Sequence, residues 1–448
     1  MVTIRKYFAT FGLAVALTGF GCSRPTPPPV DVTVPPPTAI QAGSDSTEGA
    51  IRFLEDKARA DPDDFIARNK LVDYYLQRLR ETGSVKYLEL ATQAASESLA
   101  AIPAAQNIGG LAAEAQVEFA SHEFAAARDH ALQLREADPD KLYPLLILGD
   151  SLLELGDYGG AADVFRQIEQ RGSTSDAGAL NAQTRFARLA LLQGDPDAAR
   201  RHFAEALTAA EQMNPAPRET VAWCYWQLGE TAFVTGDYAE AERRYADSLT
   251  ALPDYFRALA GMARVKAAQG DIAGAIAGYE RVTRILPDPS FVATLGDLYS
   301  ISGRDRDAAT QYDLVEQIGR LSKLNGVLYN RQLALFRADH DTMGDEAFTS
   351  AQREYETRRD IYGADAVAWT ALKARRLPEA QSAMADALRL GTRDARLWYH
   401  AGMIARAAGD RDVGRGEALL CPMSEGGHVP HRAGPFAAAR PCRPRTVM

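Results

Sequence analysis

The chain has 448 residues, 46% of them hydrophobic and 24% charged, a composition typical of a folded protein. This length is too great for one compact core and indicates several domains or an elongated array of repeats. The formal net charge is −9, although both ends of the chain are basic. Nucleic-acid binding needs clustered Lys and Arg, so the acidic body argues against nucleic acid as a partner.

The first 21 residues have the features of an export signal. Two basic residues precede an apolar run at residues 7–17, which is too short to span a bilayer but suits a signal peptide. The sequence around Cys22 resembles a bacterial lipoprotein signal. That resemblance implies that 1–21 is removed, that Cys22 is lipidated, and that the lipid anchors the protein to a membrane. Gly19 stands where an aliphatic residue is usual, so cleavage to a free soluble protein remains the alternative.

A proline-rich linker is expected at residues 22–45. PTPPPVDVTVPPPT, residues 25–38, should be extended and unable to form a core. Such a spacer would hold a folded body away from a membrane surface. An ordinary disordered linker would have the same composition.

A repeat begins to show in the middle of the chain. GDYAEAERRYADSLTALPD, residues 236–254, returns 34 residues later as GDIAGAIAGYERVTRILPD, residues 270–288. In each copy a glycine is followed after five residues by alanine and after four more by an aromatic residue. The clearest copies are Gly236-Ala241-Tyr245, Gly270-Ala275-Tyr279 and Gly303-Ala308-Tyr312, and earlier ones start at Gly156 and Gly194.

Each residue of the pattern has a structural reason. The turn glycine can end a helix in a left-handed conformation, and the Asp that follows, such as Asp237, can cap the next helix. A second glycine seven residues upstream, such as Gly229, and the alanine let two helices approach closely. The aromatic residue fills the space between neighbouring helix pairs, and prolines such as Pro253 stop the second helix.

This pattern resembles the tetratricopeptide repeat family. The resemblance implies an all-α fold, a right-handed superhelical solenoid of antiparallel helix pairs, over residues 46–415. About nine pairs and an incomplete tenth are expected. Spacings of 38 and 42 residues between Gly156, Gly194 and Gly236 predict longer helices or loops in that part.

The repeat pattern stops near Arg415. Residues 416–448 form an irregular basic tail in which Arg, Pro, His and Cys rise and helical periodicity disappears. A shifted reading frame and a genuine disordered tail both explain this composition. His428 and His431 lie near two cysteines, but nothing predicts a fold that would hold them around a metal ion.

No catalytic motif is found, and no catalytic residue, cofactor or metal ligand is predicted. Asp339-His340-Asp341 is expected to be a solvated turn between helices. His400 is interpreted as a packed helical residue, and Cys224 as a buried structural thiol.

The expected functional surface is a groove. In the tetratricopeptide repeat family the first helix of each pair lines the concave side, which gives a candidate partner-binding groove of Trp223, Trp226, Glu230, Phe233, Arg257, Arg264 and Asp297. Tryptophan and arginine dominate binding energy at many interfaces. The alternative is that Trp223 and Trp226 pack against the preceding repeat.

The favoured function is a non-catalytic scaffold that mediates protein–protein interactions in the bacterial cell envelope. One alternative is a periplasmic holdase resembling a chaperone. Another is a solenoid enzyme that processes carbohydrate, for which Glu230, Arg264 and Asp297 are the available candidates. The sequence does not name the protein partner, because a repeat architecture says how a surface is presented and not what it recognises.

Overall fold

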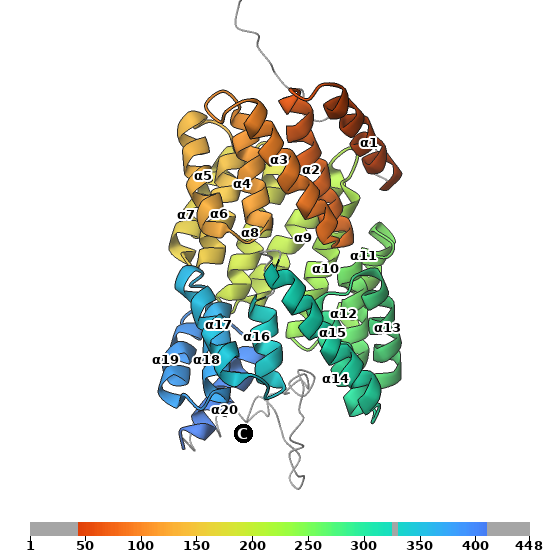
Figure 1. The fold of residues 1–448 in the computed structure, drawn as a ribbon, viewed down its shortest axis with the longest axis vertical. Coiled ribbons are helices and arrows are strands. Elements are labelled where there is room, and N and C mark those ends of the chain that lie inside the picture. Colours follow the sequence, from red (N-terminus) through yellow and green to blue (C-terminus); the bar gives the residue numbers. More distant parts are fainter. Residues whose placement is uncertain (1–43, 325–329, 410–448) are drawn as a thin grey trace, which may run out of the picture. The chain divides into compact units, whose positions relative to one another are not determined.

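The computed structural model describes residues 44–324 and 330–409, and every regular element in them is an α-helix (Figure 1). In chain order these helices are α1 Ser44–Ala60, α2 Phe65–Thr82, α3 Val85–Ala101, α4 Ile108–Ala120, α5 Phe124–Ala137, α6 Tyr143–Leu155, α7 Tyr158–Gly172, α8 Asp176–Leu192, α9 Pro196–Gln212, α10 Arg218–Val234, α11 Tyr238–Ala251, α12 Phe256–Gln269, α13 Ile272–Ile285, α14 Pro289–Ile301, α15 Asp305–Leu324, α16 Asn330–Asp339, α17 Gly344–Thr357, α18 Ile361–Lys373, α19 Leu377–Ala387 and α20 Ala395–Ala407.

The helices from α2 to α19 form nine consecutive pairs. Each helix contacts the next, and pairs such as α8 with α9 and α10 with α11 are packed along their lengths. α1 precedes the first pair, and α20 is the first helix of a further pair. The expected all-helical solenoid is therefore confirmed, with nine pairs in the described residues and α20 after the ninth.

The ends of the helices follow the predicted chemistry. Gly236 and Gly270 have φ angles of 80° and 89°, the left-handed conformation that glycine adopts without a Cβ clash. The Asp237 side chain accepts a hydrogen bond from the Glu240 amide at 3.0 Å, and Asp271 accepts one from the Gly274 amide at 2.8 Å. Each aspartate thus satisfies a backbone donor in the first turn of the second helix.

The upstream glycines make room for the aromatic residues. A Cβ on Gly229 would lie 2.5 Å from the Tyr245 ring, and one on Gly261 would lie 2.6 Å from the same ring. Gly296 stands in the same relation to Tyr312. The fully buried Tyr245 side chain therefore fits between α10 and α12 only because both helices carry glycine there.

Ala241 is fully buried beside this ring, as are Ala275 and, to 3% exposure, Ala308 in the next repeats. We expect Ala241→Leu to lower the free energy of unfolding by about 1–3 kcal/mol, because the added carbons overpack the contact between paired helices. Urea unfolding followed by circular dichroism measures this change. An exposed alanine of the same helix, Ala239, provides the control, and an equal effect of Ala239→Leu would contradict the argument.

Three helices in the middle of the array are longer than the three that follow them. α8, α9 and α10 each contain 17 residues, whereas α11, α12 and α13 each contain 14. The wide spacing of the turn glycines in this part is therefore explained by longer helices.

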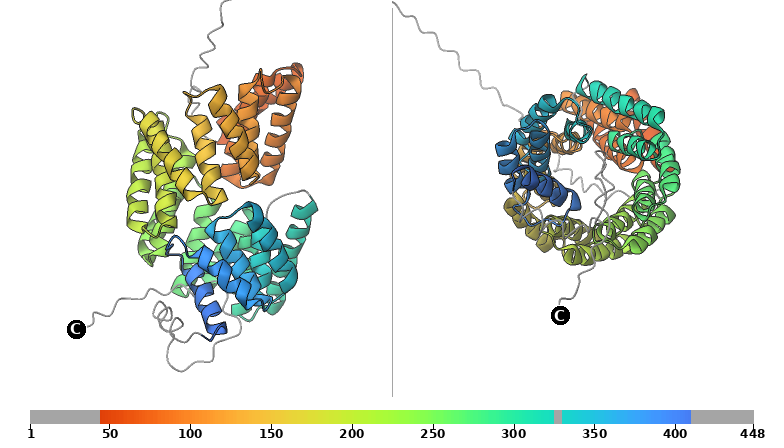
Figure 2. Two further views of the ribbon diagram at one scale, coloured as in Figure 1. Left: turned by 90° about the vertical axis from the view of Figure 1, so that its left-hand side faces the viewer. Right: turned by 90° about the horizontal axis from the view of Figure 1, so that it is seen from below.

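Residues about 200 positions apart meet where the solenoid completes one superhelical turn. The Arg359 amide donates a hydrogen bond to the Leu155 carbonyl at 3.2 Å. The Ile361 amide donates one to the Tyr158 hydroxyl at 2.9 Å, across 203 residues. This separation corresponds to six repeats of 34 residues, and the end-on view shows the described helices closing into a ring (Figure 2). The second turn therefore rests directly on the first.

None of the described helices combines the length and the apolar character that a bilayer crossing requires.

Candidate functional site

The first helices of the pairs line the concave face. Several successive first helices contact one another directly, including α2 with α4, α10 with α12 and α16 with α18. Contacts of similar extent between successive second helices are absent in the part of the chain that the structure describes. The array therefore curves toward its first helices, as the repeat pattern implies.

Charged groups on neighbouring first helices pair at a spacing of one repeat. The pairs are Asp150–Arg185 at 2.6 Å, Glu154–Arg188 at 2.5 Å, Glu230–Arg264 at 2.7 Å and Asp365–His400 at 2.7 Å. These pairs join successive repeats and fix the side chains along the concave face.

The predicted groove residues Glu230, Phe233 and Arg264 belong to one cluster (α10 and α12). Arg264 donates to both Glu230 carboxylate oxygens at 2.7 Å, and its guanidinium lies 4.0 Å from the centre of the Phe233 ring. The Tyr245 hydroxyl donates to Glu230 at 2.6 Å. Burial and the Glu230 carboxylate both raise the pKa of Tyr245. The Glu230 carboxylate thus accepts hydrogen bonds from both Arg264 and Tyr245, whereas Nε of Arg264 is buried without a hydrogen-bond partner among the described residues.

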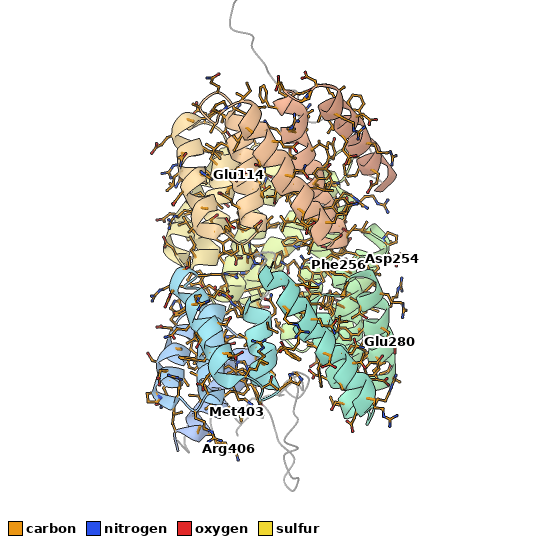
Figure 3. The ribbon with its side chains drawn as sticks, viewed as in Figure 1. Glu114, Asp254, Phe256, Glu280, Met403 and Arg406 are labelled. Carbon is orange, nitrogen blue, oxygen red and sulfur yellow. The ribbon has the colours of Figure 1, made fainter. Side chains whose placement is uncertain are left out.

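Arg257 is held differently, by aromatic rings. Its guanidinium carbon lies 5.1 Å from the centre of the Trp226 ring and 5.0 Å from that of Phe256, which Figure 3 labels at the start of α12. Among the described residues, no carboxylate or carbonyl group hydrogen-bonds this guanidinium. The rings restrict the Arg257 side chain while its N–H donors remain available.

Glu219, near the start of α10, interacts electrostatically with Arg257. Its carboxylate is 3.6 Å from Arg80 of α2 and accepts a hydrogen bond from the Tyr255 hydroxyl at 3.4 Å. Burial raises the pKa of Glu219, and the charges of Arg80 and Arg257 only partly oppose this rise. Arg257, which lies against the Trp226 ring, therefore also interacts with one buried carboxylate.

The Trp223 side chain packs against neighbouring helices. Its ring meets Phe203 edge-on, with ring centres 5.8 Å apart, and it lies beside the core that joins α8, α9 and α10. The structure therefore brings Trp226, but not Trp223, next to Arg257.

Asp297 is 8% exposed and is held within the fold. The Tyr312 hydroxyl donates to it at 3.0 Å, and His340 Nε2 lies 2.9 Å from the same carboxylate oxygen. Burial would lower the pKa of His340, but the hydrogen bond and charge of Asp297 outweigh burial and raise the pKa. Asp297 thus contacts Tyr312 and His340 and is not part of the Glu230–Arg264 pair.

In the segment Asp339-His340-Asp341 both aspartates are exposed, as expected of a solvated turn, but His340 is not. His340 is half-buried against Asp297, and the Trp369 indole donates to Asp339 at 2.8 Å. His400 is packed as expected, with 3% of its surface exposed and its ring stacked 4.2 Å from that of Trp369. Sequence reasoning missed the contacts of this segment because they join helices one repeat or more apart.

A six-residue charge cluster was also missed. Glu154 and Arg188 of the first turn meet Arg331, Glu354, Arg358 and Asp360 of the second. Attraction to Arg188 and Arg358 outweighs burial and lowers the pKa of Glu154 to about 2. The sequence does contain one indication of this cluster. Arg358-Arg359-Asp360 occupies the position at which other repeats have Leu-Pro-Asp.

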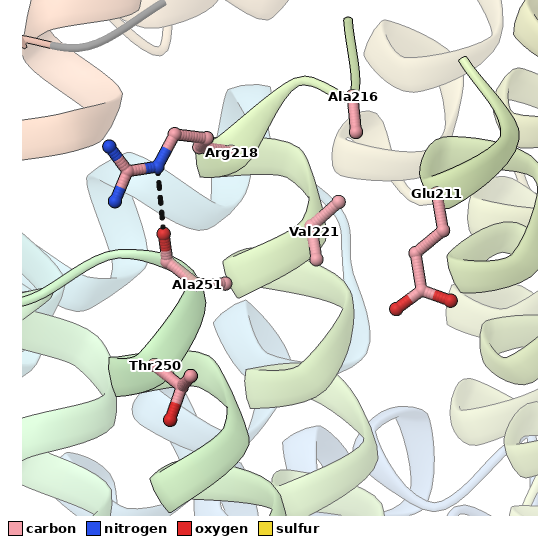
Figure 4. Close-up of a pocket in the computed structure, with 6 residues that line it drawn as sticks. All are labelled: Glu211, Ala216, Arg218, Val221, Thr250 and Ala251. Atoms are coloured by element: carbon pink, nitrogen blue, oxygen red, sulfur yellow. Dashed lines mark hydrogen bonds between the residues drawn. The ribbon is translucent and has the colours of Figure 1, made fainter. Parts of the chain in front are cut away.

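A separate pocket of about 320 Å³ lies between the end of α9, the start of α10 and the end of α11 (Figure 4). Glu211 and Arg218 are its charged lining residues, and Arg218 donates to the Ala251 carbonyl at 3.1 Å. None of the predicted groove residues lines this pocket.

Cys224 is buried, as expected, and burial raises the pKa of its thiol to about 12. Within residues 44–324 and 330–409 no group of three or more potential ligands could hold a metal ion. The predicted signal peptide, lipidated Cys22, proline-rich linker and basic tail lie outside the described residues.

The fold and its concave face define a helical-repeat solenoid. Three sequence models of the tetratricopeptide repeat match the chain, at residues 112–176, 178–254 and 235–298. This part of the chain is therefore built of tetratricopeptide repeats, and the helix pairs on either side continue the same pattern. Repeats of this family generally form non-catalytic surfaces that bind other proteins. A search of curated proteins found no match.

Solved structures provide more distant similarities. The Cut9–Hcn1 hetero-tetramer of the APC/C is 14% identical, with a TM-score of 0.47 over 84% of this chain and 63% of that one. The human IFIT1 dimer with PPP-AAAA is 14% identical, with a TM-score of 0.42 over 78% of this chain and 87% of that one. A tetratricopeptide repeat protein of Parabacteroides merdae is 15% identical, with a TM-score of 0.38 over 56% and 94%. This chain thus covers less than two thirds of the length of the matched Cut9–Hcn1 chain.

Proposed function

We propose that this protein is a non-catalytic scaffold of the bacterial cell envelope, and that it binds a protein partner on its concave face through Arg257 and Trp226. The repeat family supports protein binding. The N-terminal sequence, with its apolar run and Cys22, supports export and a lipid anchor. The observation that carries the binding site is the Arg257 guanidinium, which two aromatic rings restrict and to which no described carboxylate is hydrogen-bonded.

The chemistry of this site favours a partner that presents a carboxylate. A guanidinium recognises a carboxylate through two parallel hydrogen bonds, and its position beside Trp226 reduces the side-chain entropy lost on binding. Arg264 is less suited to this role because one of its guanidinium nitrogens already binds both oxygens of the Glu230 carboxylate. The expected contact is therefore an acidic side chain or a C-terminal carboxylate that docks on Arg257, with apolar groups against Trp226.

Affinity purification from membranes with the full chain as bait, followed by mass spectrometry, tests this proposal. Arg257→Ala should lose a partner that the parent retains, and the purified pair should show a Kd about 30-fold weaker, equivalent to about 2 kcal/mol. Arg281→Ala is the matched control, because Arg281 is an exposed arginine of the second helix α13. Equal binding by Arg257→Ala and the parent would move the interface away from this site.

A further inference from the structure

The contacts between helices α16–α20 and the first turn form what we call the seam. On the first turn it contains Phe124, Glu154, Leu155, Gly156, Tyr158, Leu192 and Gly194, and on the second Arg358, Arg359, Ile361, Arg389, Gly391 and Thr392. The second-turn residues lie at the start of α18 and in the links that precede α18 and α20. The first-turn residues lie at the ends of α6 and α8, in the turns that follow them and at the starts of α5 and α7. The seam is thus a contact between loops and helix ends rather than between packed helix faces.

We infer that the seam is a releasable clasp, and that helices α16–α20 move away from the first turn there to open the concave face from the side. This inference goes beyond the proposed function, since it states how a partner would reach the groove. It rests on the contacts that attach α16–α20 to the rest of the array and on the ion pairs that remain within each turn after the turns separate.

Helices α16–α20 have a core of their own, which includes Phe348, Ala368 and Met384. Along the chain they join α14 and α15 through an apolar cluster that includes Val292, Val315 and Phe336. The Arg337–Glu316 ion pair and the contact of His340 with Asp297 belong to the same attachment. The remaining attachment is the seam. A group of helices with its own core and two narrow attachments can move as a unit when one of them is released.

The charges at the seam remain paired when it opens. Glu154 keeps Arg188 at 2.5 Å on the first turn. Arg358 keeps Asp360 at 3.1 Å on the second turn, with Glu354 at 3.7 Å. Loss of the Glu154–Arg358 contact therefore leaves neither charge without a partner, which avoids the large cost of an isolated buried ion.

The rest of the seam consists of hydrogen bonds and of apolar and aromatic contacts. The Arg359 and Ile361 amides would exchange their first-turn acceptors for water, and the Thr392 hydroxyl would release the Leu192 carbonyl. Five apolar side chains of the second turn pack on the first-turn core: Ile361 and Leu397, which are fully buried, and Tyr362, Leu388 and Leu390, which are partly buried. Opening thus requires the exposure of these side chains, the exchange of a few hydrogen bonds and the release of Arg358 from Phe124 and of Arg389 from Tyr158.

Two glycines provide a matched pair of variants. Gly156 and Gly270 both end first helices, with φ angles of 86° and 89°. A Cβ on Gly156 would lie 2.3 Å from the Arg359 carbonyl oxygen across the seam, whereas one on Gly270 would meet nothing within 4 Å. Alanine therefore imposes the same backbone strain at both positions but pushes the turns apart only at Gly156.

Hydrogen exchange of the full chain, measured by mass spectrometry at single-amide resolution, tests the clasp without any partner. We expect the Arg359 and Ile361 amides to exchange at least 10-fold faster than the Ala364 amide, whose acceptor is the carbonyl of Asp360, the N-cap residue of α18. Gly156→Ala should accelerate the first two at least 10-fold further without changing Ala364, and Gly270→Ala should not. Tyr158→Phe, which removes the acceptor of the Ile361 amide, should accelerate that amide alone.

Exchange of Arg359 and Ile361 at the rate of Ala364 in the parent would overturn the clasp, because the turns would then separate only on unfolding. Equal effects of Gly156→Ala and Gly270→Ala would also overturn it, since strain in the turn would explain both. Partner binding by Arg257→Ala tests the proposed function separately. Loss or retention of that binding does not depend on whether hydrogen exchange supports or overturns the clasp.

Discussion

Replacing Tyr245 with alanine lowers the free energy of unfolding by about 3–5 kcal/mol, the cost of removing a large buried aromatic side chain. Tyr245 is fully buried between Gly229 and Gly261, so neither α10 nor α12 carries a side chain that could fill the cavity. The midpoint of urea unfolding, followed by far-ultraviolet circular dichroism, measures the loss.

Tyr245→Phe separates the ring from its hydroxyl. The phenylalanine variant keeps the packing and loses the hydrogen bond to Glu230, which still has Arg264, so we expect a cost of about 1 kcal/mol. If the alanine variant were no less stable than the phenylalanine variant, the ring would not hold α10 and α12 together.

Replacing Glu154 with glutamine has the second large effect, and its size depends on pH. The pKa of Glu154 is lowered from 4.5 to about 2, so its ionised form stabilises the folded chain. This contribution, about 3 kcal/mol for a shift of this size, is present above pH 4.5 and is lost as the pH falls toward 2. Glu154→Gln should therefore be less stable than the parent at pH 7, and the difference should close as the solution is acidified.

Glu114 is the contrasting control for this experiment. Burial raises the pKa of Glu114, so its ionised form is unfavourable in the folded chain and Glu114→Gln should not destabilise the protein at pH 7. Figure 3 labels Glu114 on α4, and Glu114 forms no ion pair with any member of the charge cluster. Urea midpoints of the parent and both variants between pH 2 and pH 7 would show the predicted opposite signs. A loss at Glu154→Gln that did not change with pH would refute the electrostatic explanation.

The local structure of each repeat could be predicted from the sequence because its determinants lie within one repeat. Gly236, Asp237, Ala241 and Tyr245 each act on a neighbour within about 15 residues, through a turn, a cap or a helix contact. The number of helix pairs followed from the same pattern. These features recur with a fixed spacing, so each copy supports the interpretation of the others.

The groove was only partly predictable. The motif assigns Trp223 and Trp226 to the same first helix, but which ring packs on the preceding repeat depends on Phe203, a residue of α9. The bonding of Asp297 depends likewise on His340, 43 residues away. Pairing between repeats is set by side-chain geometry, which the repeat pattern does not specify.

The seam could not be predicted because it results from the summed rotation of six repeats. A small change in the angle between successive pairs would move Arg358 away from Glu154 without altering any motif. The two arginines and the aspartate before α18 depart from the usual Leu-Pro-Asp ending, yet that departure alone does not identify their partners.

Contact across about 200 residues also constrains how this protein can evolve. Repeat arrays commonly change length by duplication or deletion of single units. Between Tyr158 and Ile361, however, such an event would displace the link before α18 by a whole helix pair and bring the wrong residues opposite Tyr158. Units inside the turn should therefore be fixed in number, while addition or loss at either end of the array would leave these contacts in register.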